Sequence, residues 1–116
     1  MIRHVGPVAS TATVILRAQV KGRQVYVVPP AASKAQLLAG IATALHFPDY
    51  FGHNLDALYE FLSDLSWLPP GPKTIVWDAA LSFMRADRAT YGSVGSIFDA
   101  TSRDAADGIE IVLCMR

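Results

Sequence analysis

The sequence predicts an α/β fold in which a small three-stranded parallel sheet is packed with about four helices. Short apolar runs with the composition of buried strands alternate with longer segments whose apolar residues recur at helical spacing. The segments between the strands are long enough for helical crossovers, which is typical of parallel strands with right-handed connections. The chain has 116 residues, of which 52% are hydrophobic, and this matches one globular domain.

Each expected strand is a short run of β-branched, aromatic and aliphatic residues that begins or ends at a turn signal. The first runs from Gln24 to Val28 and ends at two prolines, which cannot donate to a sheet ladder. The second runs from Thr74 to Trp77. The third runs from Ile109 to Cys114, after an expected turn at Asp107-Gly108.

Two helices are expected between the first and second strands. Ser33 and Gln36 form a capping-box pattern, which indicates a helix start, and apolar residues continue at helical spacing to about His46. After a turn at Gly52, Asn54 is expected to cap the next helix. The residues of this second helix that we expect to face the core are Leu55, Leu58, Phe61, Leu62 and Leu65.

Two further helices are expected before the last strand. Asp78 is expected to cap a brief helix that continues through Leu81 and Met84. A last helix is indicated by apolar residues at helical spacing, although two glycines weaken it. These apolar-face residues are Val94, Ile97, Phe98 and Thr101.

Residues 1–22 are expected to be an N-terminal extension to a main domain of residues 23–116. The best candidate for regular structure in the extension is a strand from Thr13 to Val20, because its β-branched residues favour strands. Lys21-Gly22 offers a turn, which predicts a hairpin with residues 24–28. Three roles are open for the extension: an extra edge strand of the sheet, a contact in a dimer, or no structural role.

Charge is segregated along the chain although the formal net charge is zero. Residues 1–34 carry five basic groups and no acidic group, whereas residues 35–72 carry four acidic groups and no lysine or arginine. The central segment should therefore favour a cationic partner. The scattered basic residues do not indicate nucleic-acid binding, and no apolar run is long enough to cross a membrane. The single cysteine, Cys114, fits a reducing, cytoplasmic location.

Asp56 and Glu60 are the strongest functional candidates, since they lie four residues apart on one face of an expected helix. Two like charges at this spacing weaken an isolated helix, so their presence calls for a reason outside helix stability. Three interpretations are open: an acid–base pair in an enzyme, a metal site together with His53, and the solvated face of an amphipathic helix. The sequence shows no separate nucleophile and no fourth metal ligand, so we expect no catalytic residue, metal or cofactor.

The segment from Pro48 to Glu60 resembles the signature of the barstar family, intracellular inhibitors of small secreted ribonucleases. The family pattern is proline, an acidic residue, two aromatic residues, glycine, any residue, Asn-Leu-Asp-Ala-Leu, an aromatic residue and an acidic residue. The chain matches this pattern without a gap, and a looser resemblance extends over about residues 23–116. The resemblance implies the barstar fold, a three-stranded parallel sheet with helices, and a protein that is not an enzyme.

The resemblance also implies inhibition by blocking an active site. Asp56 and Glu60 would occupy the basic pocket that receives RNA phosphate groups. Tyr50 would pack into the cleft, Tyr59 would lie between the two acids, and Ser63 would supply a hydroxyl contact. Asn54 would cap the helix, and Gly52 would permit the close turn before it. The complete set of expected partner-binding residues is Tyr50, Gly52, His53, Asn54, Asp56, Tyr59, Glu60 and Ser63.

The chain departs from the family pattern at two positions. Glu60 replaces the usual aspartate, and Ala100 falls where the family has a glutamate on its last helix, next to Asp99. These departures suggest a different ribonuclease partner. We therefore expect a cytoplasmic antitoxin or immunity protein, monomeric when free, that binds a small basic ribonuclease one-to-one. The alternative is an adaptor of the same fold that binds another basic protein, and a hydrolase ranks third.

Overall fold

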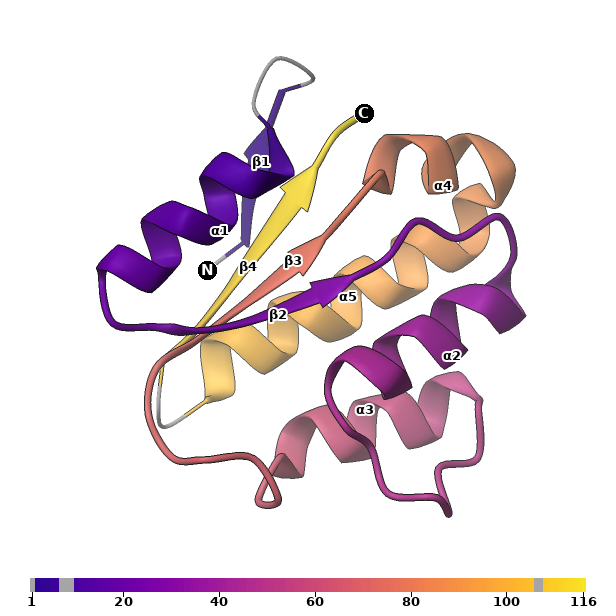
Figure 1. Cartoon of the computed structure of the whole chain (residues 1–116). Helices are drawn as coiled ribbons and strands as arrows, with labels where there is room; N and C mark the ends of the chain where they lie inside the picture. Colours follow the sequence, from indigo (N-terminus) through magenta and orange to yellow (C-terminus); the bar gives the residue numbers. More distant parts are fainter. Residues whose placement is uncertain (1, 7–9, 106–107) are drawn as a thin grey trace.

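The computed structural model of the chain describes residues 2–6, 10–105 and 108–116. Within these ranges, four parallel strands form one sheet in the order β1-β4-β3-β2, together with five helices (Figure 1). The three expected strands are confirmed, but the expected totals of three strands and about four helices are too low. The elements are β1 (Ile2–Val5), α1 (Thr11–Val20), β2 (Gln24–Val28), α2 (Lys34–Ala44), α3 (Leu55–Asp64), β3 (Lys73–Trp77), α4 (Ala80–Ala86), α5 (Arg88–Asp104) and β4 (Ile109–Cys114).

The central strands β3 and β4 are mostly apolar on both faces because helices cover both faces of the sheet. Successive side chains of a strand point to opposite faces. Ile75 and Trp77 therefore join the main core with α2, α3, α4 and α5, whereas Val76 and Val112 pack with Val14 of α1. A strand buried on both sides reads as a continuous apolar run, which is why the sequence marked these two strands clearly.

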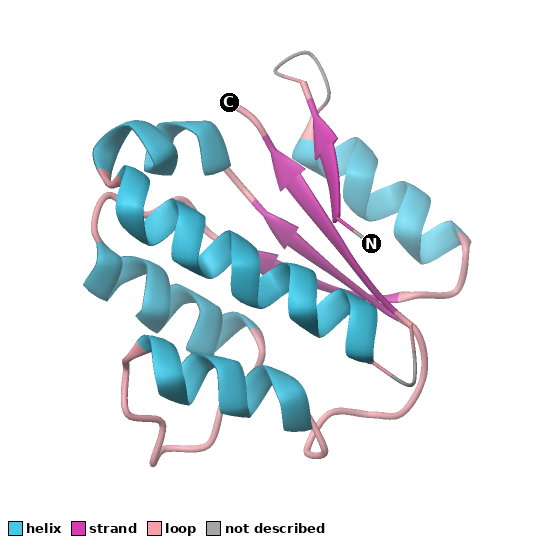
Figure 2. Cartoon of the chain, turned by 180° about the vertical axis from the view of Figure 1, so that it is seen from behind, coloured by secondary structure: helices cyan, strands magenta, loops and turns pink. Residues whose placement is uncertain are grey.

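The direction of the crossovers explains why the helices divide between the two faces. From β2 through β3 to β4, each step goes to a neighbouring strand, and Figures 1 and 2 show the connecting helices α2, α3 and α5 on one side of the sheet. The connection from β1 to β2 crosses in the opposite direction, from edge to edge. A right-handed crossover in that direction places its helix, α1, on the other face, where both figures show it.

The predicted strand from Thr13 to Val20, and with it the predicted hairpin, is wrong. The segment is α1, capped by the Ser10 side chain, which accepts a hydrogen bond from the Thr13 N–H at 3.0 Å. Only Val14 and Ala18 of this helix are buried, at the four-residue spacing of a helical stripe. The extra strand lies earlier, at β1, and it pairs in parallel with β4 rather than with β2.

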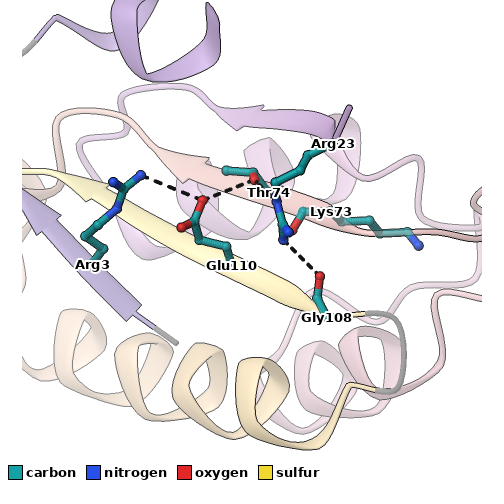
Figure 3. Close-up of polar contacts among 6 residues, drawn as sticks. All are labelled: Arg3, Arg23, Lys73, Thr74, Gly108 and Glu110. Carbon is teal, nitrogen blue, oxygen red and sulfur yellow. Dashed lines mark hydrogen bonds and ion pairs between the residues drawn. The ribbon is translucent and has the colours of Figure 1, made fainter. Parts of the chain in front are cut away.

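A row of polar side chains crosses the sheet on the face that α1 covers (Figure 3). The Arg3 guanidinium lies 3.7 Å from a Glu110 carboxylate oxygen, and the Thr74 hydroxyl donates to that same oxygen at 3.3 Å. Arg23 donates to the Thr74 hydroxyl at 2.8 Å and to the carbonyl of Gly108 at 2.9 Å. The row links β1, β4 and β3 to the segment before β2, so it ties the N-terminal strand to the sheet.

The start of α4 also differs from the prediction. Ala79, in the left-handed region at φ 53°, precedes this helix, and no side chain caps it. Asp78 instead accepts hydrogen bonds from the Thr11 hydroxyl at 2.9 Å and from the Arg116 guanidinium at 2.9 Å. The predicted turn at Asp107-Gly108 falls partly outside the described residues, and Gly108 has a φ of 75°. None of the helices in the described ranges has the length and apolar character needed to cross a membrane.

Candidate functional site

A cluster of aromatic rings supports the turn before α3. The ring centroids of Phe47 and Phe51 lie 4.9 Å apart, and those of Phe51 and Phe61 lie 5.2 Å apart. Trp67 completes the cluster, with its ring centroid 5.8 Å from that of Phe61. Its indole N–H donates a hydrogen bond to the backbone carbonyl of Leu45 at 2.9 Å. Tyr50 stacks edge-on against Phe61 at 5.5 Å, yet it is 80% exposed. The turn therefore exposes the Tyr50 ring to solvent, while the packed rings of the cluster support it.

Asn54 caps α3 as predicted. Its side-chain oxygen accepts a hydrogen bond from the Ala57 N–H at 2.8 Å, and its amide donates to the Gly52 carbonyl at 3.2 Å. A Cβ atom at Gly52 would lie 3.1 Å from the Asn54 amide nitrogen, which is closer than most packing contacts and would push on the cap. Gly52 thus leaves room for the cap, and the cap sets the direction in which α3 begins.

His53 does not lie on the face of α3 that carries the acids. It precedes the helix in the left-handed region, at φ 49°, and its Nδ1 lies 3.1 Å from the Phe51 carbonyl oxygen. Its ring packs against the Phe51 ring at 4.8 Å. Across the described residues, no three His, Cys, Asp or Glu side chains are grouped so as to hold a metal ion. The geometry therefore gives the metal interpretation no support.

Three exposed carboxylates follow one another along α3. Asp56, Glu60 and Asp64 occur every fourth residue, so they share one face of the helix, and we name them the acidic stripe. Asp56 lies in the first turn, where the helix dipole favours a negative charge. Glu60 and Asp64 lie farther along and lack this support, which leaves their placement without a reason in helix stability. The same spacing could have identified Asp64 from the sequence.

The acidic residues divide into two groups by their partners. Nine of them are described, and four have hydrogen bonds or ion pairs: Asp78, Asp87, Asp99 and Glu110. Among the described residues, no side-chain partner is found for the other five. These five are Asp49 in the turn, the acidic stripe, and Asp104 at the end of α5. The carboxylates without internal partners therefore gather on α3 and beside it.

Two residues of the acidic stripe, Asp56 and Glu60, border a shallow groove between α3 and α5. Leu55 and Tyr59 line the groove from α3, and Ser93 and Ile97 line it from α5. Asp56 and Glu60 line its α3 side together with Tyr59, which is half-exposed. A groove with an exposed aromatic ring and two free carboxylates is suited to bind a basic surface.

Ser63 and Asp99 each make a side-chain hydrogen bond within their own helix. The Ser63 hydroxyl donates to the Tyr59 carbonyl at 2.7 Å, and in this arrangement its oxygen is left to accept a hydrogen bond from a partner. Asp99 pairs with Arg103 at 2.7 Å along α5 and is not among the residues lining the space between the two helices. Ala100 does line that space, together with Tyr59 and Asp104. Asp104 is the acidic residue of α5 that sequence reasoning missed, since only the packing of α5 on α3 brings it there.

Comparison with known proteins agrees with the signature at the start of α3. A family model described as Barstar (barnase inhibitor) matches residues 26–115. A comparison with curated proteins finds no match. The matched region contains the turn, α3 and α5, and it leaves β1 and α1 outside. Because the match covers most of the chain, this protein belongs to the barstar family.

Proposed function

We propose that this protein inhibits a small basic ribonuclease by binding it one-to-one and blocking its active site with α3. The observation that carries the proposal is the acidic stripe: three carboxylates on one helix face, without internal partners among the described residues. The description of the family as barnase inhibitors supports a ribonuclease as the partner. Within this proposal, α3 acts as a decoy for the phosphates of RNA.

The chemistry of RNA cleavage explains why such a decoy blocks it. A ribonuclease presents cationic side chains that stabilise the charge on the reacting phosphate. Asp56 and Glu60 offer negative charge to the same groups and form charge-assisted hydrogen bonds with them. Because neither carboxylate has an internal ion pair among the described residues, neither must leave a partner before it binds. The Asn54 cap and the cluster of aromatic rings hold α3 in place, which reduces the entropy lost when the helix binds a partner.

The distribution of charge favours fast encounter with a basic protein. The acidic stripe and Asp49 lie in a segment without lysine or arginine. Basic residues of the first 34 residues lie mainly on the N-terminal elements, and α1 is on the other side of the sheet from α3 (Figure 2). These N-terminal basic residues therefore do not cancel the negative field around Asp56 and Glu60, which steers a cationic partner toward α3.

The proposal extends to the remaining properties of the protein. We propose that the inhibitory domain comprises residues 23–116, that the free protein is monomeric, and that it acts as an antitoxin in the cytoplasm. A reducing location is compatible with Cys114, which is buried, and burial raises the pKa of its thiol. Catalysis is not needed for any part of this function.

A cleavage assay tests the proposal directly. Purified protein is mixed at increasing ratios with barnase, and with any small secreted ribonuclease encoded beside its gene, and RNA cleavage is followed by fluorescence. We expect cleavage to stop near a one-to-one ratio with the cognate enzyme. The double variant Asp56→Ala, Glu60→Ala should restore cleavage, whereas Asp99→Ala, which removes a carboxylate already paired with Arg103, should inhibit like the parent.

Two outcomes would contradict the proposal. If the double variant inhibits as well as the parent, the acidic stripe is not the binding face. If the parent forms a stable complex with the ribonuclease without slowing RNA cleavage, the protein is an adaptor rather than an inhibitor. Size-exclusion chromatography with light scattering separates these outcomes, because it reports the complex independently of activity.

A further inference from the structure

Helix α1 carries a second apolar stripe on the side that faces away from the sheet. Leu16 is 60% exposed and Val20 is 79% exposed, and the two residues lie about one helical turn apart. We propose that this side of α1, with Arg17 and Lys21 beside the stripe, docks on a membrane surface that contains anionic lipids. The inference goes beyond the proposed function and does not depend on it, because α1 and α3 lie on opposite faces of the sheet (Figures 1 and 2).

The helical repeat places the exposed stripe opposite to the buried one. Val14 and Ala18 are the buried residues of α1, and they face the sheet. Each residue advances about 100° around a helix, so Leu16 and Val20 point about 160° away from them. Among the described residues, the only other large apolar side chains that are exposed are two tyrosines of the candidate site. The stripe on α1 is therefore the exposed apolar pair that the proposed function does not use.

The charges around the stripe favour an anionic partner. Arg17 and Lys21 lie four residues apart along one flank of the stripe, and both are exposed, without side-chain partners among the described residues. Residues 1–34 contain no acidic group. Two acidic residues also lie toward this side of the sheet, but Asp78 pairs with an arginine at 2.9 Å and Glu110 lies 3.7 Å from another. The helix dipole accounts for cations at this end of α1, but it does not account for the apolar stripe beside them.

The kind of apolar residue favours a lipid surface over an acidic protein. The centres of protein interfaces are rich in tryptophan, tyrosine and arginine that fill pockets, whereas Leu16 and Val20 are aliphatic and stand on the convex outer side of a helix. Such side chains can enter the boundary between lipid headgroups and acyl chains. The long side chains of Arg17 and Lys21 can then reach outward to the anionic headgroups.

The arrangement of the fold leaves both faces free to act at the same time. Figures 1 and 2 show α1 alone on its side of the sheet, whereas residues of α2, α3, α4 and α5 join the main core on the other side. A membrane that meets the outer side of α1 therefore leaves α3 directed toward solvent. The protein would bind the lipid surface and still present the acidic stripe to a partner.

A vesicle flotation assay with the full chain tests the inference without any ribonuclease. One set of vesicles contains phosphatidylcholine mixed with anionic phosphatidylglycerol, and the matched set contains phosphatidylcholine alone. We expect binding to the anionic set only, at millimolar lipid, because two short side chains bury less apolar surface than a myristoyl chain, whose association constant is about 10⁴ M⁻¹. Added salt should weaken this binding by screening the charges.

Two pairs of substitutions separate the apolar contribution from the charged one. Arg17→Gln with Lys21→Gln should weaken binding about 25-fold, since each cation near an anionic surface contributes about fivefold. Leu16→Gln with Val20→Gln should weaken it about tenfold or more. Glutamine is a good helix former and all four side chains are exposed, so both variants should melt like the parent. If one pair fails to fold, the other decides.

A second pair of cations is the matched control for net charge. Arg85→Gln with Arg88→Gln removes two exposed cations from α4 and α5, on the other side of the sheet, and should bind vesicles like the parent. The inference is overturned if this control weakens binding as much as the pair on α1. It is also overturned if the parent does not bind the anionic vesicles, or binds phosphatidylcholine alone equally well.

Two other occupants of the stripe give distinct results. Binding of soluble polyglutamate that Leu16→Gln with Val20→Gln leaves unchanged would assign the cations to an acidic protein and overturn the lipid proposal. A dimer in light scattering that the same pair converts to a monomer would assign the stripe to a second copy and overturn it as well. Absence of vesicle binding together with intact inhibition in the cleavage assay would remove this inference and leave the proposed function standing.

Discussion

Asp78→Asn is expected to destabilise the protein at neutral pH because Asp78 joins three separate parts of the chain. Its side chain, only 12% exposed, follows β3 and accepts hydrogen bonds from Thr11 of α1 and from Arg116 at the C-terminus. Burial opposes its ionisation, but the hydrogen bonds from Arg116 and Thr11 outweigh burial and lower the pKa of the carboxyl group. The ionised form is therefore the one that the fold favours.

The expected loss follows from these contacts. Asparagine keeps one acceptor but removes the charge, so the Thr11 bond loses about 1 kcal/mol of charge assistance. The ion pair with Arg116, which is 52% exposed, contributes about 0.5 kcal/mol more. The free energy of unfolding should thus fall by about 1.5 kcal/mol, which shifts the urea midpoint by about 0.7 M at a typical slope of about 2 kcal/mol/M.

The pH dependence supplies the second part of the measurement. A carboxyl group whose pKa is lower in the folded state stabilises the fold above its unfolded pKa, about 3.9, and this contribution is lost as pH falls through the folded pKa. Urea unfolding followed by tryptophan fluorescence at pH 7 and at several values below 4 should show the parent and the variant converging in acid. Asp99→Asn is the control, since its exposed pair with Arg103 is worth at most about 0.5 kcal/mol.

A stability difference that stays constant from pH 7 to strongly acidic pH would refute this reasoning, because it would show that the charge of Asp78 does not cause the loss. An effect no larger than that of Asp99→Asn at pH 7 would refute the role of burial.

Two further variants separate stability from binding. Asn54→Ala removes the 2.8 Å bond to the Ala57 N–H and should cost about 1 kcal/mol, or about 4 °C in melting temperature, and should also weaken inhibition; Ser33→Ala, which removes the cap of α2, is the control that should lower only the melting temperature. Tyr50→Ala should leave the melting temperature nearly unchanged, because the ring is 80% exposed, but should weaken ribonuclease binding by about 2 kcal/mol in a calorimetric titration; unchanged affinity would remove Tyr50 from the binding face.

The elements that the sequence predicted well are those whose local signals and tertiary environment agree. Ser33 caps α2 as predicted and accepts from the Gln36 N–H at 3.2 Å, while the Gln36 side chain reaches back to accept from the N–H of Ala32, one residue before the cap, at 2.8 Å. In α3, the apolar residues expected at the core are buried or packed against it, with Leu58 and Leu62 buried most deeply. These patterns depend on spacing along one helix, which the sequence contains in full.

The N-terminal segment was predicted wrongly because its local signal is weak and its environment is decided elsewhere. Val14 and its neighbours favour a strand, but β propensity is a modest preference that packing overrides. Here the second face of the sheet, with Val76 and Val112, requires cover, and a helix with a buried stripe at Val14 and Ala18 supplies it. The edge position of β1 sets the crossover direction and hence the face, and no single segment of the sequence records that order.

For the candidate site, the sequence by itself predicted that Asp56 and Glu60 share one helix face, because a helical repeat places every fourth residue together. The same repeat also places Asp64 on this face, although the sequence analysis did not single it out. It also determined the cap and the turn that begin this helix. Only the tertiary structure decided that Ala100 and Asp104 face the same surface from α5, and that the acids on α3 lack internal partners in the described chain. The physical reason is that contacts between helices depend on how distant segments pack, which local spacing does not specify.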